Sequence, residues 1–123
     1  MRRMRCAPAG AVSLIFEYDD GWPETSTPLL VLHGELDPAT PFFRALEAAD
    51  HLTAPHQHFV SFPHGAHGVT RGTPLPSDPD HDHCAMQLYL AFVQDPSGPL
   101  DLSCVDEVLP IDFEGTPELA ASY

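Results

Sequence analysis

Two short apolar runs, each followed by a loop rich in Pro and Gly, constrain the fold of this chain more than any other feature. The first run, Leu29–Leu32, is unbroken and is bounded by Pro28 and His33-Gly34, the pattern of a strand covered on both faces in a parallel sheet. The second run, His58–Phe62, ends at a Pro. Between them, residues 42–51 carry apolar side chains at helical spacing. This order predicts a βαβ unit.

The loops that follow the two predicted strands hold the candidate catalytic side chains. Asp37 follows the first strand and His67 follows the second. The parallel strands of a βαβ unit end at the same edge of the sheet, where ligands and catalytic groups gather in open α/β sheets. Each residue alone also has an ordinary explanation, because Asp before Pro is a common turn former and loop histidines are mostly solvated. His64, in the same loop, competes with His67 for the same role.

The second half of the chain predicts a long loop and one more helix. Residues 63–82 are interrupted by Pro and Gly and predict a loop. The helix is expected over about His83–Val93, with Asp80 or Asp82 as its N-cap. Val108–Phe113 is a candidate short strand. The side chains expected on the core face of this helix are Cys84, Leu88, Ala91 and Phe92.

The chain is expected to hold one structured region. We predict a poorly structured segment over residues 1–26, an α/β region over 27–113 and a frayed tail over 114–123. The first 16 residues combine a basic start with a short apolar stretch, which faintly imitates a secretion signal but lacks a small-residue cleavage motif. No convincing signal peptide is therefore expected in this chain.

Charge narrows the classes of partner. The chain has 18 acidic and 5 basic residues, a formal net charge of -13, which repels phosphate backbones and anionic headgroups. No run approaches the ~20 apolar residues that span a bilayer. Neither nucleic acid nor a membrane is expected as a partner.

Two motifs carry a resemblance to a known family. The stretch from Leu29 to Pro41, L-L-V-L-H-G-x-x-D-P-x-T-P, and the later H-G-A-H-G-V resemble the C-terminal part of an α/β-hydrolase of the tripeptidyl-aminopeptidase-like (TAP-like) group, relatives of the prolyl aminopeptidases. The resemblance covers about Pro28 to Phe113. It implies a C-terminal βαβα piece with two parallel strands, peptide or ester hydrolysis, and the chain order Ser, Asp, His for the catalytic residues. Asp37 would then be the acid of the triad and His67 the base.

The nucleophile that this family requires has no candidate here. It is expected on a G-x-S-x-G elbow between a strand and a helix, and no such motif surrounds any of the serines, Ser13, Ser26, Ser61, Ser77, Ser97, Ser103 and Ser122. We therefore expect the N-terminal strands and the elbow to lie outside this chain, and the chain alone to be inactive as a hydrolase. The expected partner is the missing N-terminal half, or a separate chain that replaces it. Two other interpretations remain open: a split enzyme that docks on a nucleophile-bearing partner, and a non-enzymatic binding or metal module.

The cysteines and histidines indicate the redox compartment of the protein and whether it could bind a metal ion. Cys84 and Cys104 bracket the last helix and its exit; a disulfide between them would stabilise the fold by roughly 3 kcal/mol and implies a secreted or periplasmic parent protein. Cys6 has no assigned partner. The run His81-Asp82-His83-Cys84 groups possible metal ligands, but structural zinc usually needs four well-spaced Cys or His residues. Neither a metal nor a cofactor is expected.

Overall fold

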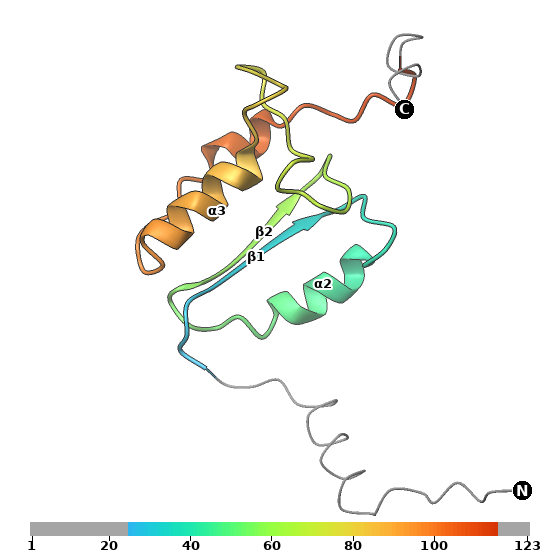
Figure 1. Cartoon of the computed structure of the whole chain (residues 1–123). Coiled ribbons are helices and arrows are strands. Elements are labelled where there is room, and N and C mark those ends of the chain that lie inside the picture. The colour runs from blue at the N-terminus through green and yellow to red at the C-terminus, as the bar shows by residue number, and fades with distance from the viewer. Residues whose placement is uncertain (1–24, 116–123) are drawn as a thin grey trace, which may run out of the picture.

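The computed structural model describes residues 25–115, which form a two-stranded parallel sheet with a helix on each side (Figure 1). Strand β1 comprises Leu29–Gly34 and strand β2 comprises Gln57–Phe62; helix α2, Phe42–Ala49, connects them. Helix α3, Cys84–Gln94, and the 3₁₀ helix η1, Ser103–Glu107, follow. The predicted α/β class and the parallel pairing of the two strands are confirmed.

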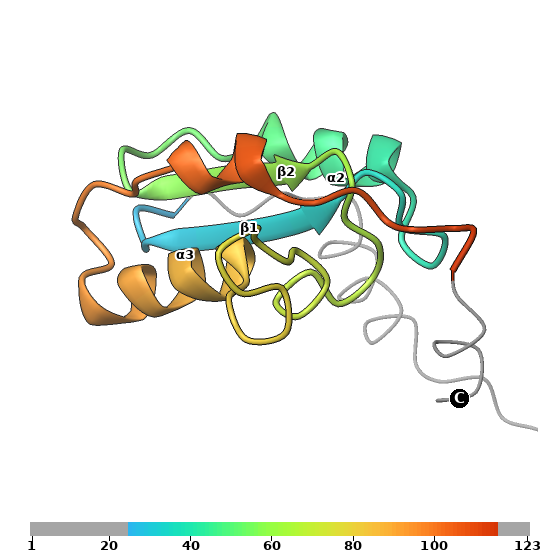
Figure 2. The same cartoon turned by 90° about the horizontal axis from the view of Figure 1, so that it is seen from above.

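The pairing of the strands assigns alternate side chains to opposite faces of the sheet. Val60 and Phe62 of β2 belong to the core that includes α3. On the other face, the ring of Phe42 in α2 lies 5.8 Å from the ring of His33 and 6.5 Å from that of Phe59. Helices α2 and α3 therefore cover different faces, and the view from above in Figure 2 shows the strands between them.

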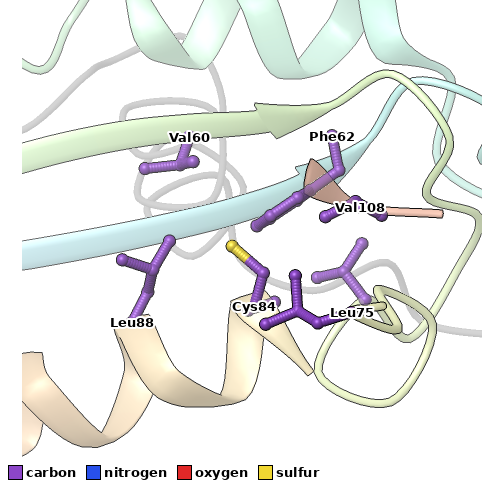
Figure 3. Close-up of a cluster of buried hydrophobic side chains, with 8 residues drawn as sticks. Val60, Phe62, Leu75, Cys84, Leu88 and Val108 are labelled. Carbon is purple, nitrogen blue, oxygen red and sulfur yellow. The ribbon is translucent and has the colours of Figure 1, made fainter. Parts of the chain in front are cut away.

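The hydrophobic core lies between the sheet and α3 (Figure 3). Phe62 of β2 and Cys84 of α3 are fully buried at its centre. The long loop and the segment after η1 close it from the sides. Its buried members are Val60, Phe62, Val69, Leu75, Cys84, Ala85, Leu88 and Val108. The loop between β2 and α3 is thus fixed by its own apolar side chains.

Helix α3 differs from the expectation in its cap and in one core residue. Its N-cap is His83, and neither Asp80 nor Asp82 caps it. Instead, the backbone N–H of Ala85 donates to the hydroxyl of Thr73, which is fully buried in the preceding loop (3.0 Å). A distant residue therefore supplies the acceptor that a local side chain usually provides.

Ala91, expected in the core, is exposed. The buried residues of α3 are Cys84, Ala85 and Leu88, so the centre of the buried stripe is shifted away from position 91. The opposite side of α3 exposes Tyr89 and Val93, among other apolar residues.

The candidate strand Val108–Phe113 does not form. Val108 is buried in the core, and the N–H of Leu109 donates to the carbonyl of Pro74 (2.9 Å). Pro110 follows and has no N–H to continue a ladder. The buried side chain of Val108 and the hydrogen bond of Leu109 therefore hold the start of this segment against the core.

Residues 1–24 and 116–123 lie outside the described part of the chain. The expectations for Cys6 and for a poorly structured start concern these residues and so also lie outside it. The proposed boundaries at residues 26 and 113 remain predictions. Within residues 25–115, neither helix combines the length and the apolar character that crossing a bilayer requires.

Candidate functional site

The ends of β1 and β2 bring two loops together at one edge of the sheet. The N–H of Leu36 in the first loop donates to the carbonyl of Gly65 in the second (3.0 Å). The N–H of Glu35 donates to the carbonyl of Phe62 at the same distance. These bonds continue the parallel ladder past the strands and fix the loops against each other.

Gly34 permits this close approach. A Cβ atom added to Gly34 would overlap the backbone of Gly65 and the carbonyl oxygen of Ala66. In the second loop, Gly68 has φ +77°, a left-handed conformation that favours glycine. The glycines before Asp37 and after His67 thus set the backbone paths that carry these two side chains.

Asp37 and His67 form a hydrogen-bonded pair between the loops. The Nδ1 atom of His67 lies 2.8 Å from Oδ2 of Asp37. The Asp37 side chain is only 5% exposed, whereas the His67 side chain is 65% exposed. The contact uses Nδ1, so Nε2 is left for another group.

Asp37 is held by further hydrogen bonds from its own loop. Its Oδ1 accepts from the backbone N–H groups of Ala39 (2.8 Å) and Thr40 (3.0 Å), and its Oδ2 accepts from the hydroxyl of Thr40 (2.6 Å). The Thr40 hydroxyl does most to hold the pKa of Asp37 well below its ordinary value. Desolvation raises this pKa, whereas the N–H of Thr40, His67 and the N–H of Ala39 lower it further. Asp37 is therefore ionised at neutral pH.

A cavity of about 250 Å³ opens beside this pair. It is lined by the end of β1, by Asp37 and Thr40, and by residues 66–70 of the second loop. The cavity is small and open to solvent, and its walls come from both loops. It is therefore a place where a further group could meet the exposed imidazole.

Two other loop histidines, His64 and His81, lack a buried carboxylate as a partner among the described residues. His64, the competing candidate, is exposed and makes no hydrogen bond with another described residue. His81 pairs with Asp78 (3.1 Å), but this pair is exposed on the long loop, with side-chain exposures of 80% and 52%. Of these two pairs, the pair of His67 with Asp37 has the buried carboxylate and lines the cavity described above.

His33 is a lining residue that sequence reasoning treated only as the end of a strand. It lines the cavity, and neither of its buried ring nitrogens has a hydrogen-bond partner in the described part of the chain. The sequence indicates this role of His33 only by its position directly before Gly34, because residues at the carboxyl end of a parallel strand border ligand sites.

The cysteines and the possible metal ligands complete the description. Cys84 and Cys104 form a disulfide with a Cα–Cα distance of 5.6 Å, which ties α3 to η1. Within residues 25–115, no three His, Cys, Asp or Glu side chains lie close enough together to hold a metal ion. The run at residues 81–84 does not converge on one point.

Two parallel strands with helices on both faces, and with loops that meet at their carboxyl ends, form a small α/β piece that is consistent with the C-terminal part of an α/β-hydrolase. A comparison with protein families agrees: the model of the family described as TAP-like protein matches residues 3–104. The chain belongs to this family of α/β-hydrolase domains. No curated protein and no solved structure matches the chain.

Proposed function

We propose that this chain supplies the acid and the base of a Ser-His-Asp triad, Asp37 and His67, to a serine hydrolase of the aminopeptidase type. The observation that carries the proposal is the 2.8 Å contact between the buried carboxylate of Asp37 and the exposed imidazole of His67. The substrate class is a peptide or an ester. Membership of the TAP-like family supports this choice over an unrelated use of the pair.

The roles follow from the geometry of the pair. The Nδ1–H group of His67 donates to Asp37, which fixes the imidazole in the tautomer whose Nε2 is an acceptor. Nε2 takes the proton of a serine hydroxyl as the serine attacks the carbonyl carbon of the substrate. The imidazolium then donates this proton to the leaving group, and water hydrolyses the acyl-enzyme by the reverse sequence of proton transfers. Asp37 stays ionised throughout and stabilises the imidazolium.

The nucleophile and the oxyanion donors come from elsewhere in this proposal. The printed sequence has no G-x-S-x-G motif, so the serine belongs to an N-terminal hydrolase segment or to a separate chain. Such a segment would also cover the exposed imidazole of His67. The chain alone is then inactive as a serine hydrolase. The disulfide supports an oxidising compartment, and hence secretion, for the working protein.

The test joins the chain to a nucleophile. The DNA upstream of the Met1 codon is translated in every frame and searched for a G-x-S-x-G elbow; if one is found, the segment is expressed in frame with this chain. If none is found, a purified second chain that carries an elbow is mixed with it. Activity is followed by fluorophosphonate labelling and by hydrolysis of a tripeptide p-nitroanilide. The expected result is activity in the joined or mixed protein and none in the chain alone.

Variants assign the roles. In the active form, Asp37→Asn should lower kcat by roughly 10⁴-fold and His67→Ala by roughly 10⁶-fold. The matched controls are Asp78→Asn and His81→Ala, which break the exposed pair on the long loop and should leave kcat unchanged. Retained activity in His67→Ala, or labelling of a serine in the chain alone, would contradict the proposal.

A further inference from the structure

The Asp37 carboxylate is fixed in rotation by donors to both of its oxygens. The N–H groups of Ala39 and Thr40 bind Oδ1, and the hydroxyl of Thr40 binds Oδ2 from 2.6 Å. Within residues 25–115, Thr40 is the one residue that donates to both oxygens. Oδ2 also faces Nδ1 of His67, 2.8 Å away. The orientation of the Asp37 carboxylate toward His67 is thus set by residues of the loop 37–40.

We propose that Thr40 is the positioning residue of this site: its hydroxyl holds Oδ2 of Asp37 toward Nδ1 of His67. The inference deepens the proposed function and rests on it, because it assigns a role within the same acid–base pair. Thr40 does not touch the reacting atoms and acts through Asp37.

The charges around Asp37 explain why a hydroxyl is needed there. The Asp37 side chain is buried, and His67 is its only ion-pair partner among the described residues. Arg44, in α2, is paired with Glu47. When His67 is neutral, the buried negative charge is therefore stabilised by hydrogen bonds alone. The Thr40 hydroxyl supplies the bond to Oδ2 without a cation that would compete with the imidazolium formed during the reaction.

Two other roles for Thr40 are excluded or separable. Thr40 lines the cavity, but its hydroxyl donates to Asp37. Asp37 faces Nδ1 of His67 and not Nε2. The Thr40 hydroxyl is therefore not placed to act as a nucleophile that Nε2 deprotonates. A role limited to the turn would need only the backbone N–H of Thr40. Such a role predicts that removal of the hydroxyl leaves the pair of Asp37 and His67 unchanged.

The experiment is an NMR titration of the full chain. The carboxyl ¹³C shift of Asp37 reports its pKa, and long-range ¹⁵N–¹H spectra report which ring nitrogen of His67 carries the proton. In Thr40→Val we expect an upward shift of the Asp37 pKa and loss of most of the Nδ1-protonated signal. Thr40→Ser keeps the hydroxyl and should restore both readings. Thr70→Val, a cavity threonine whose hydroxyl makes no described hydrogen bond, is the matched control and should resemble the parent chain.

Asp37→Asn separates this inference from the proposed function. Because the backbone donors hold Oδ1, the amide nitrogen of Asn should take the place of Oδ2 and donate to Nδ1, so that the proton of His67 moves to Nε2. An unchanged tautomer in Asp37→Asn would count against the acid–base pair itself. A changed tautomer in Asp37→Asn, together with parent-like readings in Thr40→Val, would overturn the role of Thr40 alone. The methyl signals of Val60 in the core show that each variant is folded; if Thr40→Val is not, Thr40→Ala is read in its place.

Discussion

At the scale of single residues, Asp37 combines burial, charge and complete hydrogen bonding. A buried carboxylate without a cation is costly unless its oxygens are satisfied. Asp37 accepts four hydrogen bonds, from Ala39, from His67 and twice from Thr40. This arrangement ties the stability of the fold to the ionisation of the residue that we propose for catalysis.

Stability should therefore fall in acid. The pKa of Asp37 is lower in the folded chain than in the unfolded chain, so the unfolded chain binds more protons as pH falls through the ordinary carboxyl range near about pH 4. The stabilisation is fully present above that range and is lost progressively as the pH falls below it toward the lower pKa of Asp37 in the folded chain. Asp101, whose pKa is lowered by the N–H of Ser103, acts in the same direction. Urea unfolding between pH 6 and 3 should show this fall, and Asp37→Asn should make it shallower; an equal slope in both proteins would contradict the assignment.

Gly34 should be intolerant of a side chain. In Gly34→Ala the new methyl group would overlap the backbone of Gly65, and relief of the overlap must separate the two loops. We expect a loss of about 1–3 kcal/mol in the free energy of unfolding. Gly72→Ala is the matched control, because its Cβ would lie 3.6 Å from the nearest atom, an ordinary contact.

In Gly34→Ala, the hydrogen bond between His67 and Asp37 should also weaken, which the Nδ1 proton signal of His67 would report. A parent-like free energy of unfolding in Gly34→Ala, or an equal loss in Gly72→Ala, would show that the close approach is not what requires glycine at position 34.

The candidate site could be predicted from the sequence only in part. The predicted parallel strands point to Asp37 and to the loop that holds His64 and His67. The choice of His67 over His64 rests on the resemblance to the TAP-like group, in which the base stands just before a glycine. Thr40 and Gly34 were not assigned their roles, because these depend on the rotation of one carboxylate and on the distance between two loops. Neither quantity leaves a periodic signal in the sequence.

At the scale of elements, α3 depends on a residue of the preceding loop. The hydroxyl of Thr73 donates to the carbonyl of Val69 (2.9 Å) and accepts from the N–H of Ala85 (3.0 Å). The same residue therefore holds the loop that carries His67 and the first turn of α3. The strands and helices were predicted from apolar spacing, but this cap was not, because its partners are 12 residues apart in the sequence.

Removal of this hydroxyl should destabilise the fold. In Thr73→Val the size of the side chain is kept, but the buried N–H of Ala85 loses its acceptor, which costs about 1–3 kcal/mol. Urea unfolding measures the loss, and the amide of Ala85 should exchange faster with solvent. Thr73→Ser retains the hydroxyl and should recover most of the stability. A stable Thr73→Val with a protected Ala85 amide would show that the cap contributes little.

At the scale of the whole molecule, the described chain leaves much apolar surface uncovered. Parallel sheets are normally covered on both faces, yet α2 contains no buried residue. Helix α3 exposes Tyr89, Leu90 and Val93 by 47%, 50% and 57% on the side away from the sheet. An exposed apolar patch of this kind on a helix commonly marks a surface that another protein segment covers. The negative charge of the chain makes copies repel each other at long range, but salt screens this repulsion.

The chain alone should therefore associate through the exposed side of α3. Sedimentation at moderate salt should show species larger than the 13.4 kDa monomer. The double variant Leu90→Glu with Val93→Glu should shift the chain toward the monomer without unfolding it, because both side chains are already half exposed. Gln87→Glu with Gln94→Glu adds the same charge to exposed polar positions of the same helix and should leave the association unchanged. If both double variants were equally monomeric, added charge alone would account for the loss of association. If the parent chain were already monomeric, the exposed side of α3 would not be an association surface.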